Sequence, residues 1–342
     1  MANSLSWWNR RFAQCGLFLF LCLYAAGLSA AEAGNTAASA TAPAANADNV
    51  APTAVSPSVP APVWQPLIKR LAAEGQNKTA LNIMFAGLPD SISQSPMGRK
   101  VLELYRSKFV YSKPDGSPAK PRPKYYPGTI TEKHALLCRN FLKEYSTAFD
   151  QAEQKTGVPR NIACALLFVE TRLGANVGKE NALYTLASMA LSTTPDNITT
   201  WLPKMEGYEA HLDWMKELMP KRAEWAYTEL RALTAHAIKQ NIDPRIMPGS
   251  IYGALGMCQF MPSNIEPYGA DGDNDGVIDL YNPADAIASL SNYLHKFGWK
   301  AGIDEAAQHA VLRKYNKSDT YANTILGLAA VIGGASVPDD AQ

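Results

Sequence analysis

The chain has 342 residues, of which 47% are hydrophobic and 18% are charged, a composition ordinary for a globular protein. Its 32 Lys and Arg residues against 31 Asp and Glu residues give a formal net charge of +1. The chain therefore lacks the basic surplus of a dedicated nucleic-acid binder. Its only long apolar run lies near the N-terminus, which excludes a protein with several membrane spans. The length suits one large or two medium domains.

Residues 1–31 have the pattern of a secretory signal peptide. Arg10 and Arg11 precede the apolar run 16–26, and the small residues at 29–31 provide a cleavage site. The apolar run is short for a membrane span, so an uncleaved anchor helix is the less favoured alternative. We therefore expect export, with the mature protein working in the periplasm of a bacterial envelope.

Two segments of different character follow the predicted signal. Residues 32–63 are rich in Ala, Pro, Ser and Thr and contain no aromatic residue, which predicts a disordered linker. Residues 64–128 are expected to form an N-terminal helical region that ends in a proline-rich loop over 111–128. This loop carries several Lys and Arg residues together with Tyr125 and Tyr126. Such a loop can line a groove for an acidic sugar polymer, and a solvated linker is the equally favoured alternative.

The remainder, residues 129–335, is predicted to be one helical core. Apolar residues recur at three- and four-residue steps, and few segments alternate with period two. The expected fold class is therefore mainly α (or α+β), with at most a small sheet. The main helices predicted along the whole chain are 97–109, 129–155, 162–172, 181–192 and 208–240.

One carboxylate stands in an unusual place. Glu170 directly follows the apolar run 163–169, so it should lie at the C-terminal end of a buried helix. Burial and the negative end of the helix dipole both disfavour the ionised form, so we expect a raised pKa. A carboxylic acid that stays protonated near neutral pH is suited to general acid catalysis. The alternative is a structural ion pair with Arg172 or Lys179.

Four sequence blocks follow one another over about 200 residues: 169–191, which begins VETRLG; 249–263, GSIYGALGMCQFMPS; 285–299; and 315–322, YNKSDTYA. In sequence and in order these blocks resemble the MltB-type lytic murein transglycosylases. The resemblance implies a lysozyme-like transglycosylase core. It also implies cleavage of the β-1,4 MurNAc–GlcNAc bond of peptidoglycan, with formation of 1,6-anhydro-muramoyl ends.

The implied mechanism uses one carboxyl group twice. Glu170 protonates the glycosidic oxygen, and the substrate's own N-acetyl group stabilises the cation that develops at C1. Glu170 then removes the proton from the muramoyl 6-hydroxyl as that oxygen attacks C1. A hydrolase with an inverting or covalent retaining mechanism needs a second carboxylate. The sequence leaves open whether Glu180 or Asp196 folds nearby.

The resemblance also implies a set of substrate-binding residues. Ser250 and Gln259 match groove residues that bind N-acetyl sugars, and Tyr293 matches an aromatic residue that lines the site. Asn316 and Tyr321 match polar residues beside the catalytic acid. The alternatives are loop structure for Ser250 and Gln259, and core packing for Tyr293.

A candidate calcium loop lies within the core. The sequence DGDNDGVID at 271–279 is the first half of an EF-hand loop, with carboxylates at positions one, three and five and glycine at six. Position twelve is Asn282 instead of the usual Glu, and Asp285 can supply the missing carboxylate. An acidic turn without metal is the alternative. The predicted ligands of a structural Ca²⁺ are Asp271, Asp273, Asp275, the Val277 carbonyl and Asp285.

The cysteines and the departures from the family pattern leave questions open. After signal cleavage three cysteines remain, Cys138, Cys164 and Cys258, which allow at most one internal disulfide beside a free thiol. Each stands in an apolar stretch, so the favoured interpretation is that they are small buried hydrophobic residues. Leu173 stands where the family usually has Trp, and Cys258 where it has a small residue. The segment 192–221 matches the family poorly.

The leading interpretation is a monomeric periplasmic lytic transglycosylase whose partners are peptidoglycan glycan strands and other cell-wall enzymes. We expect no organic cofactor. Three alternatives remain: a muramidase that uses water, a non-catalytic peptidoglycan-binding protein and a calcium-sensing adaptor.

Overall fold

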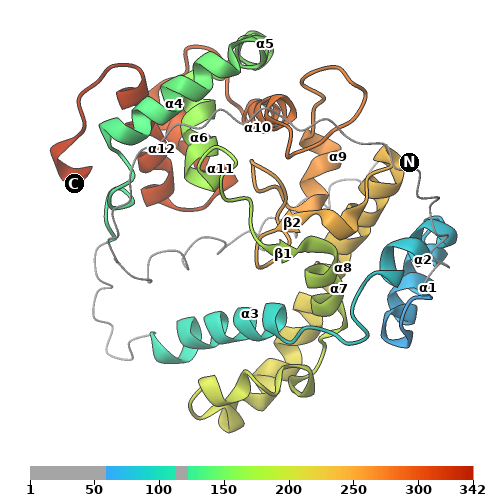
Figure 1. Cartoon of the computed structure of the whole chain (residues 1–342). Helices are drawn as coiled ribbons and strands as arrows, with labels where there is room; N and C mark the ends of the chain where they lie inside the picture. Colours follow the sequence, from blue (N-terminus) through green and yellow to red (C-terminus); the bar gives the residue numbers. More distant parts are fainter. Residues whose placement is uncertain (1–58, 112–121, 342) are drawn as a thin grey trace, which may run out of the picture. The chain divides into compact units, whose positions relative to one another are not determined.

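The computed structural model describes residues 59–111 and 122–341. The predicted signal peptide (1–31), nearly all of the predicted linker (32–63) and the middle of the proline-rich loop (111–128) lie outside the described residues. Within the described part, the predicted mainly helical class is confirmed (Figure 1). The α-helices are α1 (Gln65–Ala73), α2 (Lys78–Ala86), α3 (Ser95–Tyr105), α4 (Glu132–Glu144), α5 (Ser146–Thr156), α6 (Arg160–Thr171), α7 (Ala182–Leu191), α8 (Leu212–Gln240), α9 (Ile265–Tyr268), α10 (Pro283–Lys296), α11 (Glu305–Tyr315) and α12 (Asp319–Ile332).

Short helical turns and a two-stranded sheet complete the described chain. The strands are β1 (Glu180–Asn181) and β2 (Pro248–Gly249). The short turns are η3 (Pro62–Trp64), the π-helical η4 (Arg106–Val110), η5 (Pro195–Ile198), η6 (Leu202–Lys204), η7 (Tyr208–His211), η8 (Pro244–Ile246), η9 (Pro262–Asn264) and η10 (Asp339–Ala341).

The helix predicted over 129–155 is two helices in the structure. α4 and α5 meet at Tyr145, whose φ of −107° and ψ of 31° are not helical. Backbone hydrogen bonds continue across the junction, so the chain bends there without forming a loop. The bend lets α4 pack against α6 and α12 while α5 packs against α10. No Pro or Gly marks this bend, and tertiary packing therefore decides it.

Two other predicted boundaries also need correction. The helix predicted over 97–109 begins at Ser95 and ends at Tyr105, and the π-helical η4 replaces its last turn. The first residues of the helix predicted over 208–240 form the separate turn η7. α8 then continues through Pro220 to Gln240.

The main hydrophobic core surrounds α6. This helix packs against α4, α5, α10 and α12, and most of its side chains are buried. Trp64, predicted as the start of the folded chain, is fully buried in the same core. A second hydrophobic cluster lies between α3, α7 and α8 and is rich in methionine. Its methionines are Met97, Met189, Met205, Met215 and Met219. The poorly matching segment 192–221 thus packs into this second cluster, together with residues of α3, α7 and α8.

The small sheet brings two of the family-like sequence blocks together. β1 follows the end of α6, and β2 begins the block at 249–263. The strands are antiparallel, with Glu180 opposite Gly249 and Asn181 opposite Pro248. Gly178 makes this approach possible, since a Cβ atom there would lie 2.0 Å from the Gly249 carbonyl oxygen. The loop at 249–263 is thereby held against the C-terminal end of α6.

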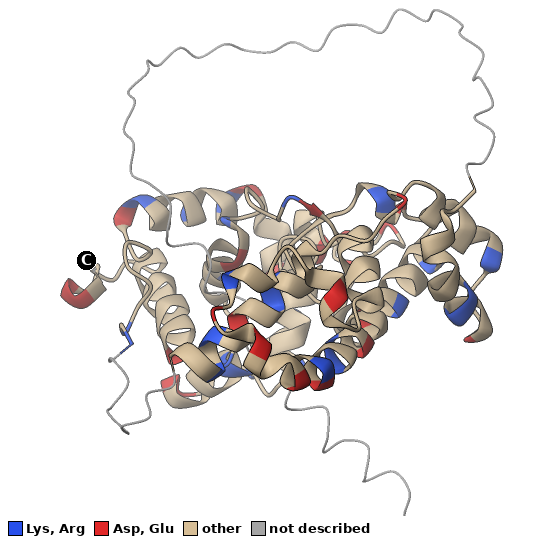
Figure 2. Ribbon diagram, turned by 90° about the horizontal axis from the view of Figure 1, so that it is seen from below, with Lys and Arg blue, Asp and Glu red and all other residues tan. Residues whose placement is uncertain are grey.

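The charge pattern agrees with the nearly balanced composition. Figure 2 shows basic and acidic residues interleaved along the helices. Among residues 59–111 and 122–341, no helix combines the length and the apolar character needed to cross a membrane.

Candidate active site

Glu170 occupies the last turn of α6, where the helix terminates in a left-handed backbone. The three residues Arg172, Leu173 and Gly174 all have positive φ, and they turn the chain away from the helix axis. The Glu170 side chain is only 7% exposed. Its Oε1 accepts a hydrogen bond of 2.5 Å from the hydroxyl of Tyr321 on α12.

Burial raises the pKa of Glu170 to about 7, and the hydrogen bond from Tyr321 opposes this rise. No charged side chain of the described residues contributes to the shift, so neither Glu180 nor Asp196 acts as an electrostatic partner. The alternative ion pair is also not formed. The Arg172 guanidinium lies 4.5 Å from the centre of the Phe168 ring instead. Glu170 is therefore an isolated, buried acid that holds its proton near neutral pH.

Two tyrosines next to Glu170 come from the C-terminal helices. The rings of Tyr315 and Tyr321 are stacked, with centroids 6.4 Å apart. The Tyr315 hydroxyl donates a hydrogen bond to the Cys258 carbonyl oxygen. Burial raises the pKa of both phenols well above the usual range, and the negative charge of Glu170 adds to the rise. Both hydroxyls are therefore neutral hydrogen-bond donors at physiological pH.

Tyr126 is a further neighbour of Glu170 that sequence reasoning placed only in a groove loop. Burial raises its pKa, a hydrogen bond with the Ser318 side chain opposes the rise, and Glu170 adds to it. The Tyr126 amide donates to Thr324 Oγ1 on α12 at 2.8 Å, which holds this end of the loop in place. No local sequence pattern marks Tyr126, because its position depends on packing against α12.

The loop at 249–263 is linked to the end of α6 beside Glu170. Thr171 Oγ1 donates to the Met257 carbonyl oxygen at 2.8 Å. Gln259 follows in a left-handed conformation, with φ of 51°. Its Nε2 donates to the carbonyl oxygens of Val177 at 3.2 Å and Gly256 at 3.0 Å.

The five predicted substrate-binding residues take different positions. Tyr321 touches Glu170 directly, as described above. Ser250 Oγ accepts from the amides of Tyr252 and Ala254, so its hydroxyl organises the loop. Asn316 is half-buried and caps the end of α11. No hydrogen bond within the described chain joins Glu170 to Ser250, Gln259 or Asn316.

Tyr293 lies within an aromatic cluster instead of an open groove. It is 7% exposed, and its hydroxyl donates to the Lys314 carbonyl oxygen at 3.1 Å. Its ring contacts those of Phe260, Tyr268, Phe297 and Tyr315. Tyr293 is therefore a core residue, as the alternative interpretation expected. Its ring packs against Tyr315.

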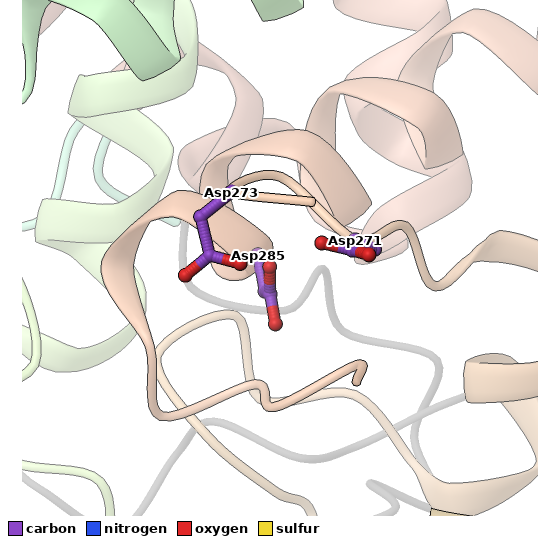
Figure 3. A group of neighbouring side chains, drawn as sticks. All are labelled: Asp271, Asp273 and Asp285. Carbon is purple, nitrogen blue, oxygen red and sulfur yellow. The ribbon is translucent and has the colours of Figure 1, made fainter. Parts of the chain in front are cut away.

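The predicted calcium loop brings three carboxylates together. One oxygen from each of Asp271, Asp273 and Asp285 lies within 4.8 Å of the others. Figure 3 shows these three side chains as neighbours. Asp285 is almost fully buried and accepts the amides of Gly272 and Asp279, each at 2.7 Å. Burial is the main cause that raises its pKa, and the charges of Asp271 and Asp273 add to the rise. These carboxylates are suitable ligands for a hard divalent cation such as Ca²⁺.

Asp275, predicted as a ligand, is not part of this carboxylate group. Its side chain is exposed, and Oδ1 accepts the amide of Val277 at 2.8 Å. The left-handed Asn274 and Gly276 on either side set this local turn. The contribution of the Val277 carbonyl stays a prediction.

Comparison with known proteins assigns the family. The family model described as "Transglycosylase SLT domain" matches residues 61–308. The chain belongs to this family. It is also 32% identical over 217 residues to membrane-bound lytic murein transglycosylase B of Escherichia coli, an alignment that covers 63% of this chain. The aligned part spans 53% of that relative, so about half of its length has a counterpart here.

Solved structures of transglycosylases share the fold. The soluble lytic transglycosylase SltB1 of Pseudomonas aeruginosa matches with a TM-score of 0.59 and 20% identity, over 80% of this chain and 98% of its own. The calcium complex of E. coli Slt35 matches with a TM-score of 0.56 and 21% identity, over 83% and 98%. SltB3 of P. aeruginosa, in complex with NAG-anhNAM-pentapeptide, matches with a TM-score of 0.59 and 20% identity, over 79% and 78%. The predicted transglycosylase fold is confirmed for this member of the SLT-domain family.

Proposed function

We propose that this SLT-domain protein is a lytic transglycosylase that cleaves the β-1,4 MurNAc–GlcNAc bond of peptidoglycan and leaves 1,6-anhydro-muramoyl ends. The observation that carries the proposal is the buried acid Glu170, which has no charged neighbour among the groups that shift its pKa and whose pKa is raised to about 7. Membership of the family and the similarity to E. coli lytic murein transglycosylase B support the same activity.

In the proposed reaction, Glu170 acts first as an acid and then as a base. The protonated carboxyl gives its proton to the glycosidic oxygen, and the substrate N-acetyl group stabilises the positive charge at C1. The resulting carboxylate then takes the proton of the muramoyl 6-hydroxyl as that oxygen bonds to C1. A pKa near the working pH suits both steps, because the group must lose and regain one proton in each cycle.

The Tyr321 hydroxyl can orient the Glu170 carboxyl group so that its proton faces the substrate. Tyr321 donates to Oε1 of Glu170, which leaves the other carboxyl oxygen to carry the proton toward the substrate. We assign Gln259 and Asn316 to recognition of the N-acetyl groups, and Ser250 to the wall of the same groove. Tyr293 supports this wall from behind. A sugar that lacks the N-acetyl group would leave such polar groups unpaired, which disfavours its binding.

We further propose that Ca²⁺ binds between Asp271, Asp273 and Asp285, with Asp275 and the Val277 carbonyl as further ligands. Three carboxylate oxygens held within 4.8 Å repel each other unless a cation neutralises them. The ion supplies positive charge that holds the loop against the N-terminal part of α10. We place the mature protein in the periplasm, with glycan strands as its substrate.

Two alternatives remain for the activity. A muramidase would release reducing ends, and a non-catalytic wall-binding protein would release no fragment. The deciding experiment is mass analysis of the muropeptides that the mature protein releases from purified sacculi. Anhydro-muramoyl products that disappear in Glu170→Gln, while binding to sacculi persists, are the expected result. Reducing ends, or unchanged turnover in Glu170→Gln, would reject the proposal.

A further inference from the structure

Two of the three cysteines in the described chain are neighbours. Cys138 lies on α4 and Cys164 on α6, two helices that pack against each other. Both side chains are fully buried. The Cys164 thiol donates a hydrogen bond of 3.5 Å to the Cys138 carbonyl oxygen, and the Cys138 side chain is close enough to help raise the pKa of Cys164. Both thiols are free in the structure, and they lie in the same buried interface between α4 and α6.

The third cysteine takes no part in this contact. Cys258 is also fully buried, but it lies in the loop at 249–263, near Glu170. The groups that affect its pKa include Phe260 and Glu170, and neither of the other thiols is among them. The sequence allows any one of three pairings, and in the described fold only Cys138 and Cys164 contact each other.

We propose that Cys138 and Cys164 form a disulfide bond when the chain folds in an oxidising compartment, and that Cys258 remains a thiol. A disulfide needs Cβ atoms at short range, and the Cys164 thiol already lies 3.5 Å from the backbone of Cys138 across the helix interface. Such bonds form and persist in exported proteins. The proposal depends on export of the chain and not on its activity toward glycans.

The reaction is a thiol–disulfide exchange with an oxidant of the disulfide class. One cysteine, as thiolate, attacks the oxidant RSSR, forms a mixed disulfide and releases one RS⁻. The second cysteine then attacks the mixed disulfide and releases the other RS⁻. The two S–H bonds are lost, one S–S bond forms, and the two protons and two electrons end on two RSH molecules.

The burial of both thiols determines when during folding the disulfide bond can form. The hydrogen bond with Cys138, together with burial, raises the pKa of the Cys164 thiol far above its usual range. Thiolate, the reactive form, is therefore scarce once α4 and α6 have packed. The bond must form while this interface is still open to solvent during folding. It then closes a loop of about 25 residues that contains all of α5, and it stabilises α6, the helix that carries Glu170.

The test is a peptide map of the full chain, exported from a bacterial host and alkylated under denaturing conditions without reductant. We expect the peptides of Cys138 and Cys164 as one linked species, two hydrogens lighter than the sum of the separate thiol peptides. Reduction should separate them, and the Cys258 peptide should be alkylated in both samples. Alkylation of Cys138 and Cys164 without reductant, or a link to Cys258, would overturn the proposal.

Thermal unfolding provides an independent measurement. Reduction should lower the Tm of the exported protein by roughly 5–10 °C, as loop-closure entropy implies for a domain of this size. The variant Cys258→Ala should keep this sensitivity to reductant, and Cys138→Ala should lose it. An unchanged Tm after confirmed reduction would contradict a stabilising disulfide. Because the peptide map uses the unmutated chain, it remains decisive if a variant fails to fold.

Discussion

The hydroxyl of Tyr321 donates a hydrogen bond of 2.5 Å to Oε1 of Glu170, although 151 positions separate the two residues in the chain. α6 ends in one family-like block and α12 begins in another, and their packing in the main core creates this contact. The bond favours the carboxylate, whereas burial favours the acid. The balance of these two effects sets the pKa of Glu170 near neutrality.

This balance predicts a pH profile that a single hydroxyl controls. Since the first step needs protonated Glu170, kcat/KM on sacculi should fall as pH rises above about 7. Tyr321→Phe removes the bond that lowers the Glu170 pKa, so the fall should move to higher pH. We also expect the maximal rate to drop about tenfold, because the acid loses its orienting partner. The measurement is initial rate against pH.

The matched control for this profile is Tyr293→Phe. It removes a buried hydroxyl that bonds to the Lys314 carbonyl oxygen and not to Glu170. The alkaline limb should therefore stay in place in this variant. An equal displacement of the limb in both variants would show that general loss of packing, and not the bond to Glu170, controls the profile.

A second prediction concerns stability. The folded-state pKa of Glu170 is raised from 4.5 to about 7, so the folded protein holds a proton that the unfolded chain releases. The resulting stabilisation is complete below about pH 4.5 and is lost as pH rises to about 7, a change of about 3 kcal/mol. Gln does not ionise and still offers an oxygen to Tyr321.

We therefore expect Glu170→Gln to be more stable than the wild type at pH 8 and to lose this advantage near pH 5. Urea unfolding at the two pH values checks the difference in the free energy of unfolding. The control is Glu217→Gln, since Glu217 is exposed on α8. A Glu170→Gln variant without any pH-dependent advantage would mean that the acid is hydrated in solution.

A third prediction concerns the carboxylates of the calcium loop. Calcium at 100 times its Kd should raise the free energy of unfolding by about 2.7 kcal/mol, and chelation should remove the effect. Asp285→Ala should abolish the response, because Asp285 is buried between the amides of Gly272 and Asp279. Thermal unfolding with calcium and with a chelator gives the comparison. Asp213→Asn on the surface of α8 is the control, and a response that survives in Asp285→Ala would exclude this site.

A fourth prediction concerns Glu229, a buried carboxylate on α8 without a cationic partner among the described residues. Its two oxygens accept the amide and the hydroxyl of Ser263, each at 2.9 Å. Ser263 ends the block that carries Gln259. Glu229→Ala should lower the free energy of unfolding by about 1–3 kcal/mol, because both Ser263 groups lose their acceptor.

Glu229→Gln keeps one carbonyl oxygen as an acceptor, and the loss should therefore be smaller. Denaturant unfolding of both variants gives the measurement. Equal stability of Glu229→Ala and the wild type would mean that water replaces the carboxylate without cost.

Local sequence pattern was sufficient to predict some features of this protein. The apolar run that ends at Glu170 predicted a buried helix with an acid of raised pKa, because the composition of a helix largely sets how much of it is buried. The spacing of Asp271 and Asp273 in a DxD turn likewise predicted convergent carboxylates. These features depend on residues a few positions apart, for which helix and turn geometry alone fixes the relation.

Tertiary structure decided the rest. Periodicity ran unbroken through Tyr145, yet packing on different partners divides the helix there. Only the packing of α6 against α12 and α4 pairs Glu170 with Tyr321 and Cys138 with Cys164. Tyr126 likewise lies near enough to feel the charge of Glu170 only because its segment is held on α12. Side-chain periodicity predicts which face of a helix is buried. It does not predict which distant residue packs against that face, because several helices offer similar apolar surfaces and only the folded arrangement determines which of them are in contact.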